Sequence, residues 1–129
     1  MQMTPDKKKN KLYIVVPCYN EEQVLGETSK RLKIKCENLI QKGQISKDSK
    51  IVFVDDGSKD RTWKMISELH ETDSLFSGVK LSRNRGHQNA LLAGLTMASE
   101  HADMAISMDA DLQDDINAVD QMIEKYYDG

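Results

Sequence analysis

The sequence has few of the features that mark secreted or membrane-spanning proteins. Its two cysteines, Cys18 and Cys36, do not form a spacing known for metal ligands, and no secretory signal precedes them. We therefore expect free thiols and a reducing, cytoplasmic setting. The apolar run over residues 12–16 is far too short for a signal core or a membrane span.

An excess of charge of one sign is also missing. The 129 residues include 18 basic and 21 acidic side chains, which gives a formal net charge of −3. This balance creates no overall field that would attract nucleic acid, and we expect no nucleic-acid partner. The basic cluster over residues 7–11 predicts a flexible, solvated tail over residues 1–11. Binding of this tail to an anionic membrane would need a second signal, and none is present.

Two glycine-rich phosphate-binding patterns are absent as well. The seven glycines form neither G-x-G-x-x-G nor G-x-x-x-x-G-K-[ST]. This argues against the usual dinucleotide-binding fold and against a P-loop.

What the sequence does contain is a strand-and-helix unit that occurs four times. Apolar runs rich in strand formers alternate with segments whose apolar residues recur at helical spacing. The expected strands cover residues 12–17, 50–55, 78–82 and 104–108, and the expected helices cover residues 22–42, 60–72, 86–101 and 116–127. Gly43 marks the end of the first helix, and Ser58 or Asp60 caps the second. This alternation predicts an α/β fold with a mostly parallel sheet and helices on both faces.

The loops after the four strands carry the unusual polar residues of the chain. Right-handed crossovers bring the carboxyl ends of all parallel strands to one edge of the sheet, where ligands of such sheets bind. The four loops cover residues 17–22, 55–58, 82–87 and 109–113. We therefore expect the functional site at this edge.

The fourth loop and the third suggest a metal and a diphosphate. Asp109 and Asp111 can converge on one hard cation, Mg²⁺ or Mn²⁺, and Gln113 can supply a further oxygen. An acidic pair alone is weak evidence, because most such pairs in loops are solvated turns. Arg83 and Arg85 are cations on an edge rich in carboxylates. A diphosphate shared between metal and arginine explains the mixture, and ion pairs with the acids are the alternative.

The first two loops suggest contacts with a nucleoside. Tyr19 either stacks on a nucleobase or lies half-buried at the sheet edge. Asn20 and Glu21 either bind a ribose or cap the next helix. Asp55 is expected to hold loop N–H groups, and Asp56 could accept from a base N–H or a ribose hydroxyl.

Two further side chains have a less specific interpretation. Cys18 could be a nucleophile, but a small residue at a strand end is the better reading. His87 stands at a helix start, where the helix dipole disfavours protonation. It could cap the helix or contact phosphate, and we do not expect it to act as a base.

Taken together, the four motifs resemble those of the inverting family 2 glycosyltransferases. The similarity covers about residues 12–128 and rests on segments 16–22, 54–58, 83–88 and 109–113. It is greatest to the polyprenyl-phosphate branch, which includes dolichyl-phosphate mannose synthases and undecaprenyl-phosphate sugar transferases. The resemblance implies a Rossmann-like GT-A fold, in which residues 12–129 form the nucleotide-sugar-binding N-terminal part.

The resemblance also implies ligands and site residues. The donor would be a UDP-sugar or GDP-sugar, and the acceptor a polyprenyl phosphate or another glycan. The positions that match donor-binding residues are Pro17, Tyr19, Glu21, Val54, Asp56, Arg83, Asp109, Ala110 and Asp111. The positions that match ligands of a divalent cation, Mg²⁺ or Mn²⁺, are Asp109, Asp111 and Gln113. The cation would neutralise charge on the leaving diphosphate.

The resemblance leaves the acceptor half of the reaction outside this sequence. The catalytic base is expected beyond Gly129, so we expect the donor-binding portion of a longer protein at the cytoplasmic face of the membrane. The family often has prolines after the position of Gln113, whereas this chain has Asp114, Asp115 and Ile116.

Three other classes of protein are weighed against this interpretation. A phosphatase of the haloacid dehalogenase kind also uses D-x-D, but places it after the first strand, whereas here it follows the fourth. A receiver-like signalling domain places its acidic pair after the first strand, and Asp55 and Asp56 follow the second. A non-catalytic module that binds a nucleotide sugar remains an alternative, and donor hydrolysis would argue against it.

Overall fold

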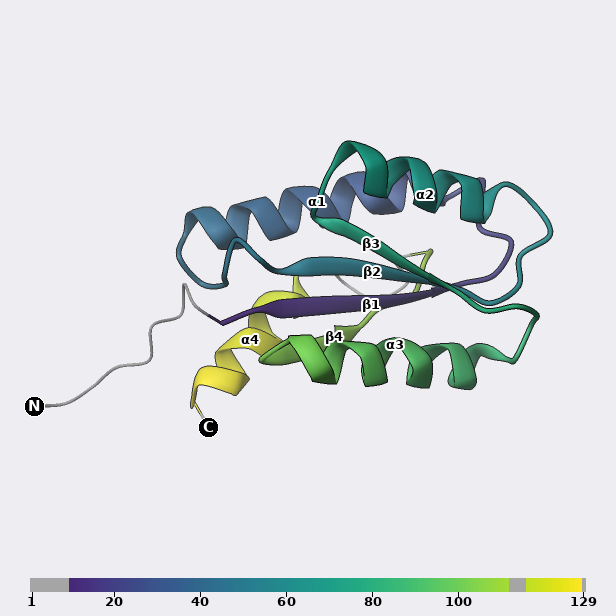
Figure 1. Cartoon of the computed structure of the whole chain (residues 1–129). Helices are drawn as coiled ribbons and strands as arrows, with labels where there is room; N and C mark the ends of the chain where they lie inside the picture. The colour runs from purple at the N-terminus through teal and green to yellow at the C-terminus, as the bar shows by residue number, and fades with distance from the viewer. Residues whose placement is uncertain (1–9, 112–115, 129) are drawn as a thin grey trace, which may run out of the picture.

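The computed structural model describes residues 10–111 and 116–128, in which strands and helices alternate along the sequence (Figure 1). The strands are β1 (Leu12–Cys18), β2 (Lys50–Asp55), β3 (Phe76–Lys80) and β4 (Met104–Ser107). The helices are α1 (Leu25–Gln41), α2 (Thr62–Thr72), α3 (His87–His101) and α4 (Ala118–Asp128). The predicted α/β alternation is confirmed.

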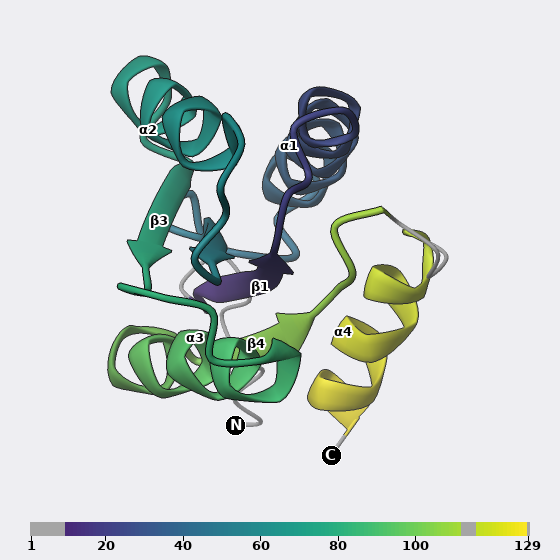
Figure 2. The same cartoon turned by 90° about the vertical axis from the view of Figure 1, so that its right-hand side faces the viewer.

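The four strands form one parallel sheet in the order β3-β2-β1-β4. Figure 2, which looks toward the edge of the sheet, shows α1 and α2 on one face and α3 on the other. Helix α4 lies beside β4 and joins the core on the side of α1. The order places β1 in the middle of the sheet, so the loop after β1 lies between the loops after β2 and β4.

Two apolar clusters hold the layers together. The larger one joins the sheet to α1, α2 and α4, and the smaller one joins β1 and β2 to α3. The smaller cluster depends on close approach, because a Cβ at Gly94 would lie 2.4 Å from Cγ1 of Val15 and 2.8 Å from Cγ2 of Val54. The small residues of α3 thus allow the helix to pack directly on the sheet.

Several predicted boundaries were wrong by two or three residues: β3 ends at Lys80 rather than at Ser82, α2 begins at Thr62 rather than at Asp60, α4 begins at Ala118 rather than at Ile116, and the starts of β3 and α1 differ as well. Strand β3 begins at Phe76 rather than at Gly78, because Phe76 is buried and pairs with Ile51. Helix α1 begins at Leu25 rather than at Glu22, because the carbonyl of Glu21 accepts the N–H groups of the first turn that follows it.

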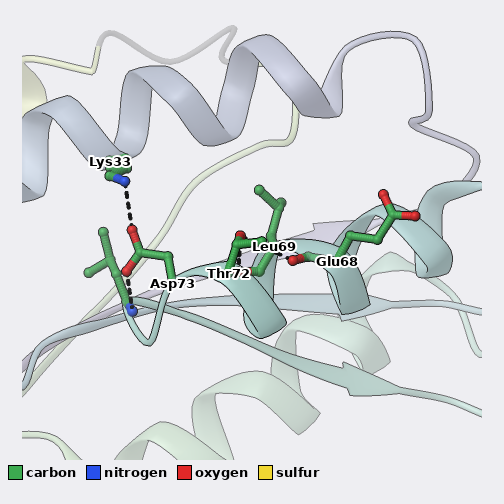
Figure 3. Close-up of polar contacts among 6 residues, drawn as sticks. Lys33, Glu68, Leu69, Thr72 and Asp73 are labelled. Atoms are coloured by element: carbon green, nitrogen blue, oxygen red, sulfur yellow. Dashed lines mark hydrogen bonds and ion pairs between the residues drawn. The ribbon is translucent and has the colours of Figure 1, made fainter.

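A polar link connects α1 to the end of α2 (Figure 3). The ammonium of Lys33 lies 2.7 Å from a carboxylate oxygen of Asp73, whose other oxygen accepts the N–H of Leu75 at 2.9 Å. The Lys33 hydrogen bond and the Leu75 N–H lower the pKa of Asp73. The Thr72 hydroxyl donates to the carbonyl of Glu68 one turn earlier. These contacts fix the turn that leads from α2 into β3.

The described chain is anchored from its first residues onward. The carbonyl of Asn10 accepts the N–H of Ser46 at 2.7 Å, and the N–H of Lys11 donates to Asp103 at 2.8 Å. Asn10 and Lys11, which the sequence assigned to the basic tail, are therefore tied to the domain. Among the described helices, none is both long enough and apolar enough to cross a membrane.

Candidate functional site

A cavity of about 300 Å³ lies at the carboxyl ends of β1, β2 and β4, as the sequence predicts. Seven of the predicted donor-binding residues line it: Pro17, Tyr19, Glu21, Asp56, Asp109, Ala110 and Asp111. They come from three different strand-end loops. The fold therefore brings together side chains that are up to 94 positions apart, from 17 to 111.

The remaining predicted residues lie elsewhere. Val54 is fully buried in the cluster beneath α3 and does not line the cavity. Arg83 is exposed and is not among the lining residues. Gln113, the third predicted metal ligand, lies outside the described residues.

The loop after β1 is shaped by contacts with the loop after β2. Asn20 adopts a positive φ of 53°, its N–H donates to the Ser58 hydroxyl, and its side-chain oxygen accepts the N–H of Lys59, both at 2.8 Å. Helix α1 begins after Val24 without a side-chain cap. The idea that Asn20 caps this helix was therefore wrong, because its side chain is bound to the neighbouring loop.

Glu21 is held in place by a second bridge between the same loops. Its N–H donates to the Thr62 hydroxyl at 2.8 Å, and that hydroxyl donates to Asp60 at 2.6 Å. The second oxygen of Asp60 accepts the N–H of Glu22 at 3.3 Å. Partial burial opposes ionisation of Asp60, but the hydrogen bonds from Thr62 and Glu22 lower its pKa overall. An ionised Asp60 thus fixes the backbone that carries Glu21.

Four acidic residues line the cavity, namely Glu21, Asp56, Asp109 and Asp111. Burial raises the pKa of Glu21, and the charges of Asp111, Asp60 and Asp109 raise it further. Like charges that are close together favour the protonated form of one of them. A cation bound near these acids would offset this repulsion.

The loop after β4 presents Asp109 and Asp111 on either side of a buried residue. Ala110 is buried, and its carbonyl accepts a hydrogen bond from the hydroxyl of Thr28 on α1. Asp109 is half-buried and Asp111 is exposed. The described residues contain no group of three His, Cys, Asp or Glu side chains that could hold a metal ion. The two carboxylates of Asp109 and Asp111 still fit Mg²⁺ or Mn²⁺, because water and phosphate oxygens commonly fill the other coordination positions of these ions.

Two other acidic or thiol groups near the cavity have structural roles. Asp55 is buried and accepts the N–H of Ser58 at 3.3 Å, which confirms its predicted role. Cys18 is also buried, and burial raises the pKa of its thiol well above its usual range, with further contributions from Glu21 and Asp55. A thiol with a raised pKa is a poor nucleophile. Cys18 is therefore a small residue at a strand end, as the sequence favoured.

Sequence reasoning missed part of the cavity wall. Asn84 and Gly86 line the cavity from the loop before α3, and His87 and Ala90 line it from the first turn of that helix. The available signal was their place directly after a parallel strand. Only His87 was considered as a ligand contact.

Comparison with known families identifies the chain. The sequence pattern of glycosyl transferase family 2 matches residues 13–129. The chain belongs to this family.

Individual members of the family share much of the sequence. YkoT, a glycosyltransferase of Bacillus subtilis, is 52% identical over 118 residues, which are 92% of this chain and 35% of YkoT. An undecaprenyl-phosphate 4-deoxy-4-formamido-L-arabinose transferase of an Enterobacter species is 34% identical over 98% of this chain and 37% of its own length. The chain thus spans about a third of the length of the curated relatives it matches.

Solved structures agree on the fold. The mannosyltransferase PcManGT of Pyrobaculum calidifontis, in complex with GDP-Man and Mn²⁺, matches 84% of this chain and 30% of its own with a TM-score of 0.61 and 23% identity. Staphylococcus aureus TarS matches 91% of this chain and 20% of its own with a TM-score of 0.64 and 20% identity. The GT-A fold expected from the resemblance is confirmed.

Proposed function

We propose that this chain is the donor-binding part of a glycosyltransferase that takes a sugar from a nucleoside diphosphate sugar. The observation that carries the proposal is the single cavity in which an aromatic ring, Tyr19, and the acids Glu21, Asp109 and Asp111 meet. An aromatic face suits a nucleobase, and carboxylates that hold a divalent cation suit a diphosphate. Family membership supports the same proposal.

Within this proposal, Asp109 and Asp111 hold Mg²⁺ or Mn²⁺. The cation, when bound, neutralises charge on the departing diphosphate. The chain's own residues provide the rest: Pro17 stiffens the exit of β1 because its φ is fixed, and the bridge through Asp60 orients Glu21. The GDP-Man and Mn²⁺ of the Pyrobaculum mannosyltransferase are consistent with such a donor.

The acceptor in this proposal is a polyprenyl phosphate. Its support is the name of the Enterobacter relative, an undecaprenyl-phosphate sugar transferase, and that of a prophage bactoprenol glucosyl transferase homologue of Escherichia coli, 38% identical over 92% of this chain and 36% of its own length. A transferase with such an acceptor would work at the cytoplasmic face of a membrane. The relatives extend beyond the segment that they share with this chain. We place the base that deprotonates the acceptor in the region that corresponds to this additional part.

Calorimetric titration of the chain with UDP and with GDP tests the donor site. With Mn²⁺ present, one of the two nucleotides is expected to bind, and EDTA is expected to abolish the heat. ADP with Mn²⁺ is the control for binding of any nucleotide by an acidic surface. Equal binding of all three nucleotides, or binding that EDTA leaves unchanged, would refute the proposed metal-dependent donor site.

A further inference from the structure

Three successive backbone N–H groups of the loop after β1 donate to side chains at the start of α2 and in the loop before it. The N–H groups of residues 20, 21 and 22 donate, in that order, to the side chains of Ser58, Thr62 and Asp60, at 2.8, 2.8 and 3.3 Å. These three side chains are not among the residues that line the cavity. Their influence on a ligand in the cavity would pass through the loop that they hold.

The hydroxyl of Thr62 has its orientation set by a neighbouring carboxylate. Thr62 is fully buried at the start of α2, and its hydroxyl and its N–H both donate to one oxygen of Asp60, at 2.6 and 2.9 Å. A hydroxyl has a single proton, and an ionised carboxylate can only accept. Donation to Asp60 therefore leaves the lone pairs of the hydroxyl for the N–H of Glu21.

Both polar backbone groups of Glu21 are bound in this way. Its N–H donates to Thr62, and its carbonyl accepts the N–H groups of Val24 and Leu25 at 3.1 and 2.9 Å. The residue before it, Asn20, has a φ of 53°, which is uncommon for a residue other than glycine and persists only where the surroundings hold it. The backbone that carries Glu21 thus depends on contacts with α2 and the loop before it.

Electrostatic repulsion makes a fixed backbone important at this position. The Glu21 side chain lines the cavity together with Asp109 and Asp111, and the charges of these two acids contribute to the raised pKa of Glu21. In their ionised forms the carboxylates repel one another, which favours movement of Glu21 away from the other two. A hydrogen bond from its N–H to a buried hydroxyl opposes that movement.

We propose that Thr62 is a positioning residue for the nucleotide: its hydroxyl, oriented by Asp60, holds the backbone of Glu21 so that the Glu21 carboxylate is already placed in the cavity before the ligand arrives. This inference rests on the proposed donor site. It extends that site to a residue that does not line the cavity. A group held in place before binding loses less conformational freedom on binding, which increases affinity.

The first part of the test is amide hydrogen exchange without nucleotide. Thr62→Val keeps the shape of the side chain but removes the hydroxyl, so exchange at the Glu21 N–H is expected to become about tenfold faster. Thr62→Ser restores the hydroxyl and should restore the protection. Thr72→Val is the matched control, because its hydroxyl lies at the other end of α2 and bonds to carbonyls of its own helix. Unchanged exchange at Glu21 in Thr62→Val would overturn the proposal.

The second part measures the affinity for the nucleotide that the wild type binds in the presence of Mn²⁺. Thr62→Val should bind it about tenfold more weakly, while Thr62→Ser and Thr72→Val should bind it as the wild type does. Undiminished affinity in Thr62→Val would overturn the inference. If thermal unfolding shows that Thr62→Val does not fold, Asp60→Ala takes its place in both measurements, because it removes the orienting carboxylate at a partly exposed position.

The third part tests the route through Glu21. Glu21→Ala is compared alone and together with Thr62→Val. Because Thr62 acts through Glu21, the loss in the double variant should be smaller than the product of the two single losses. A full product, or wild-type affinity in Glu21→Ala, would contradict this route. Failure of the wild type to bind any nucleotide would refute the donor site and this inference with it, whereas normal wild-type binding that Thr62→Val leaves unchanged would overturn this inference alone.

Discussion

At the amino ends of the strands polar groups are bound to one another, whereas at the carboxyl ends carboxylates crowd into one cavity. The Ser49 hydroxyl accepts the N–H of Leu12 at 2.9 Å, and the hydroxyl of Tyr127 on α4 donates to the carbonyl of Gln44 at 2.7 Å. Ser49 is only 1% exposed. Contacts of this kind close the amino edge and contribute to the stability of the fold.

The carboxyl edge is arranged in the opposite way. Glu21 has a raised pKa because it is partly buried and lies near Asp111, Asp60 and Asp109. An arrangement of like charges costs stability, and shifted pKa values of this kind cluster at functional sites. The comparison teaches that the same sheet closes one edge with paired polar groups and gathers acids at the other, where we propose that a ligand binds.

The largest expected effect is a loss of nucleotide binding on mutation of the carboxyl edge. Asp111→Ala removes one of two described candidate metal ligands and should weaken Mn²⁺-dependent nucleotide binding by about 100-fold or more, since even groups that merely support metal ligands contribute 10–100-fold. Its thermal unfolding should change little, because Asp111 is exposed. Asp48→Ala, an exposed acid near the amino edge, is the control. Undiminished binding in Asp111→Ala would show that the metal is held elsewhere.

A smaller effect is expected at the amino edge, and on stability alone. Ser49→Ala leaves the buried N–H of Leu12 without its acceptor, which costs about 1–3 kcal/mol of unfolding free energy. Urea denaturation measures this loss. Nucleotide affinity should stay unchanged, because Ser49 contacts the amino end of β1 and the cavity lies at its carboxyl end. Ser99→Ala, which removes an exposed hydroxyl bonded within its own helix, should cost less than about 0.5 kcal/mol. Equal losses in the two variants would contradict the role of Ser49.

The smallest effect has the opposite sign. The folded pKa of Glu21 is raised, so its ionised form opposes folding at neutral pH, and this cost disappears as pH falls below the unfolded value. Glu21→Gln should therefore stabilise the ligand-free protein at pH 7, by less than about 0.5 kcal/mol because solvent screens the half-exposed group. The gain should vanish in acid. Glu22→Gln, at an exposed position, is the control, and a destabilised Glu21→Gln would contradict the repulsion.

The fold could be predicted from the sequence largely because its signals are local. Apolar runs and helical spacing identified every described strand and helix. Strand β3 was placed two residues too far along the chain, because the pairing of Phe76 with Ile51 depends on the neighbouring strand. A register set by a partner strand leaves little trace in the strand's own sequence.

The site could be predicted in position but not in its internal contacts. The rule that parallel strands end at one edge placed Tyr19, Glu21 and Asp109 together. Single residues were harder, because Asn20 and Asp56 can each bind several partners. The partners that these two side chains bind depend on how closely the strand-end loops approach each other. That distance is set by the packing of the whole molecule.

Paramagnetic broadening of amide signals by Mn²⁺ tests the difference between the two edges most directly. Mn²⁺ is added to the isotope-labelled chain together with the nucleotide that binds, with Mg²⁺ as the diamagnetic reference. The amides of Tyr19, Gly86 and Ala110 should broaden, while those of Ser49 and Gln44 at the amino edge should remain sharp. Broadening centred on the amino edge, or equal broadening throughout the chain, would contradict the assignment of the ligand to the carboxyl edge.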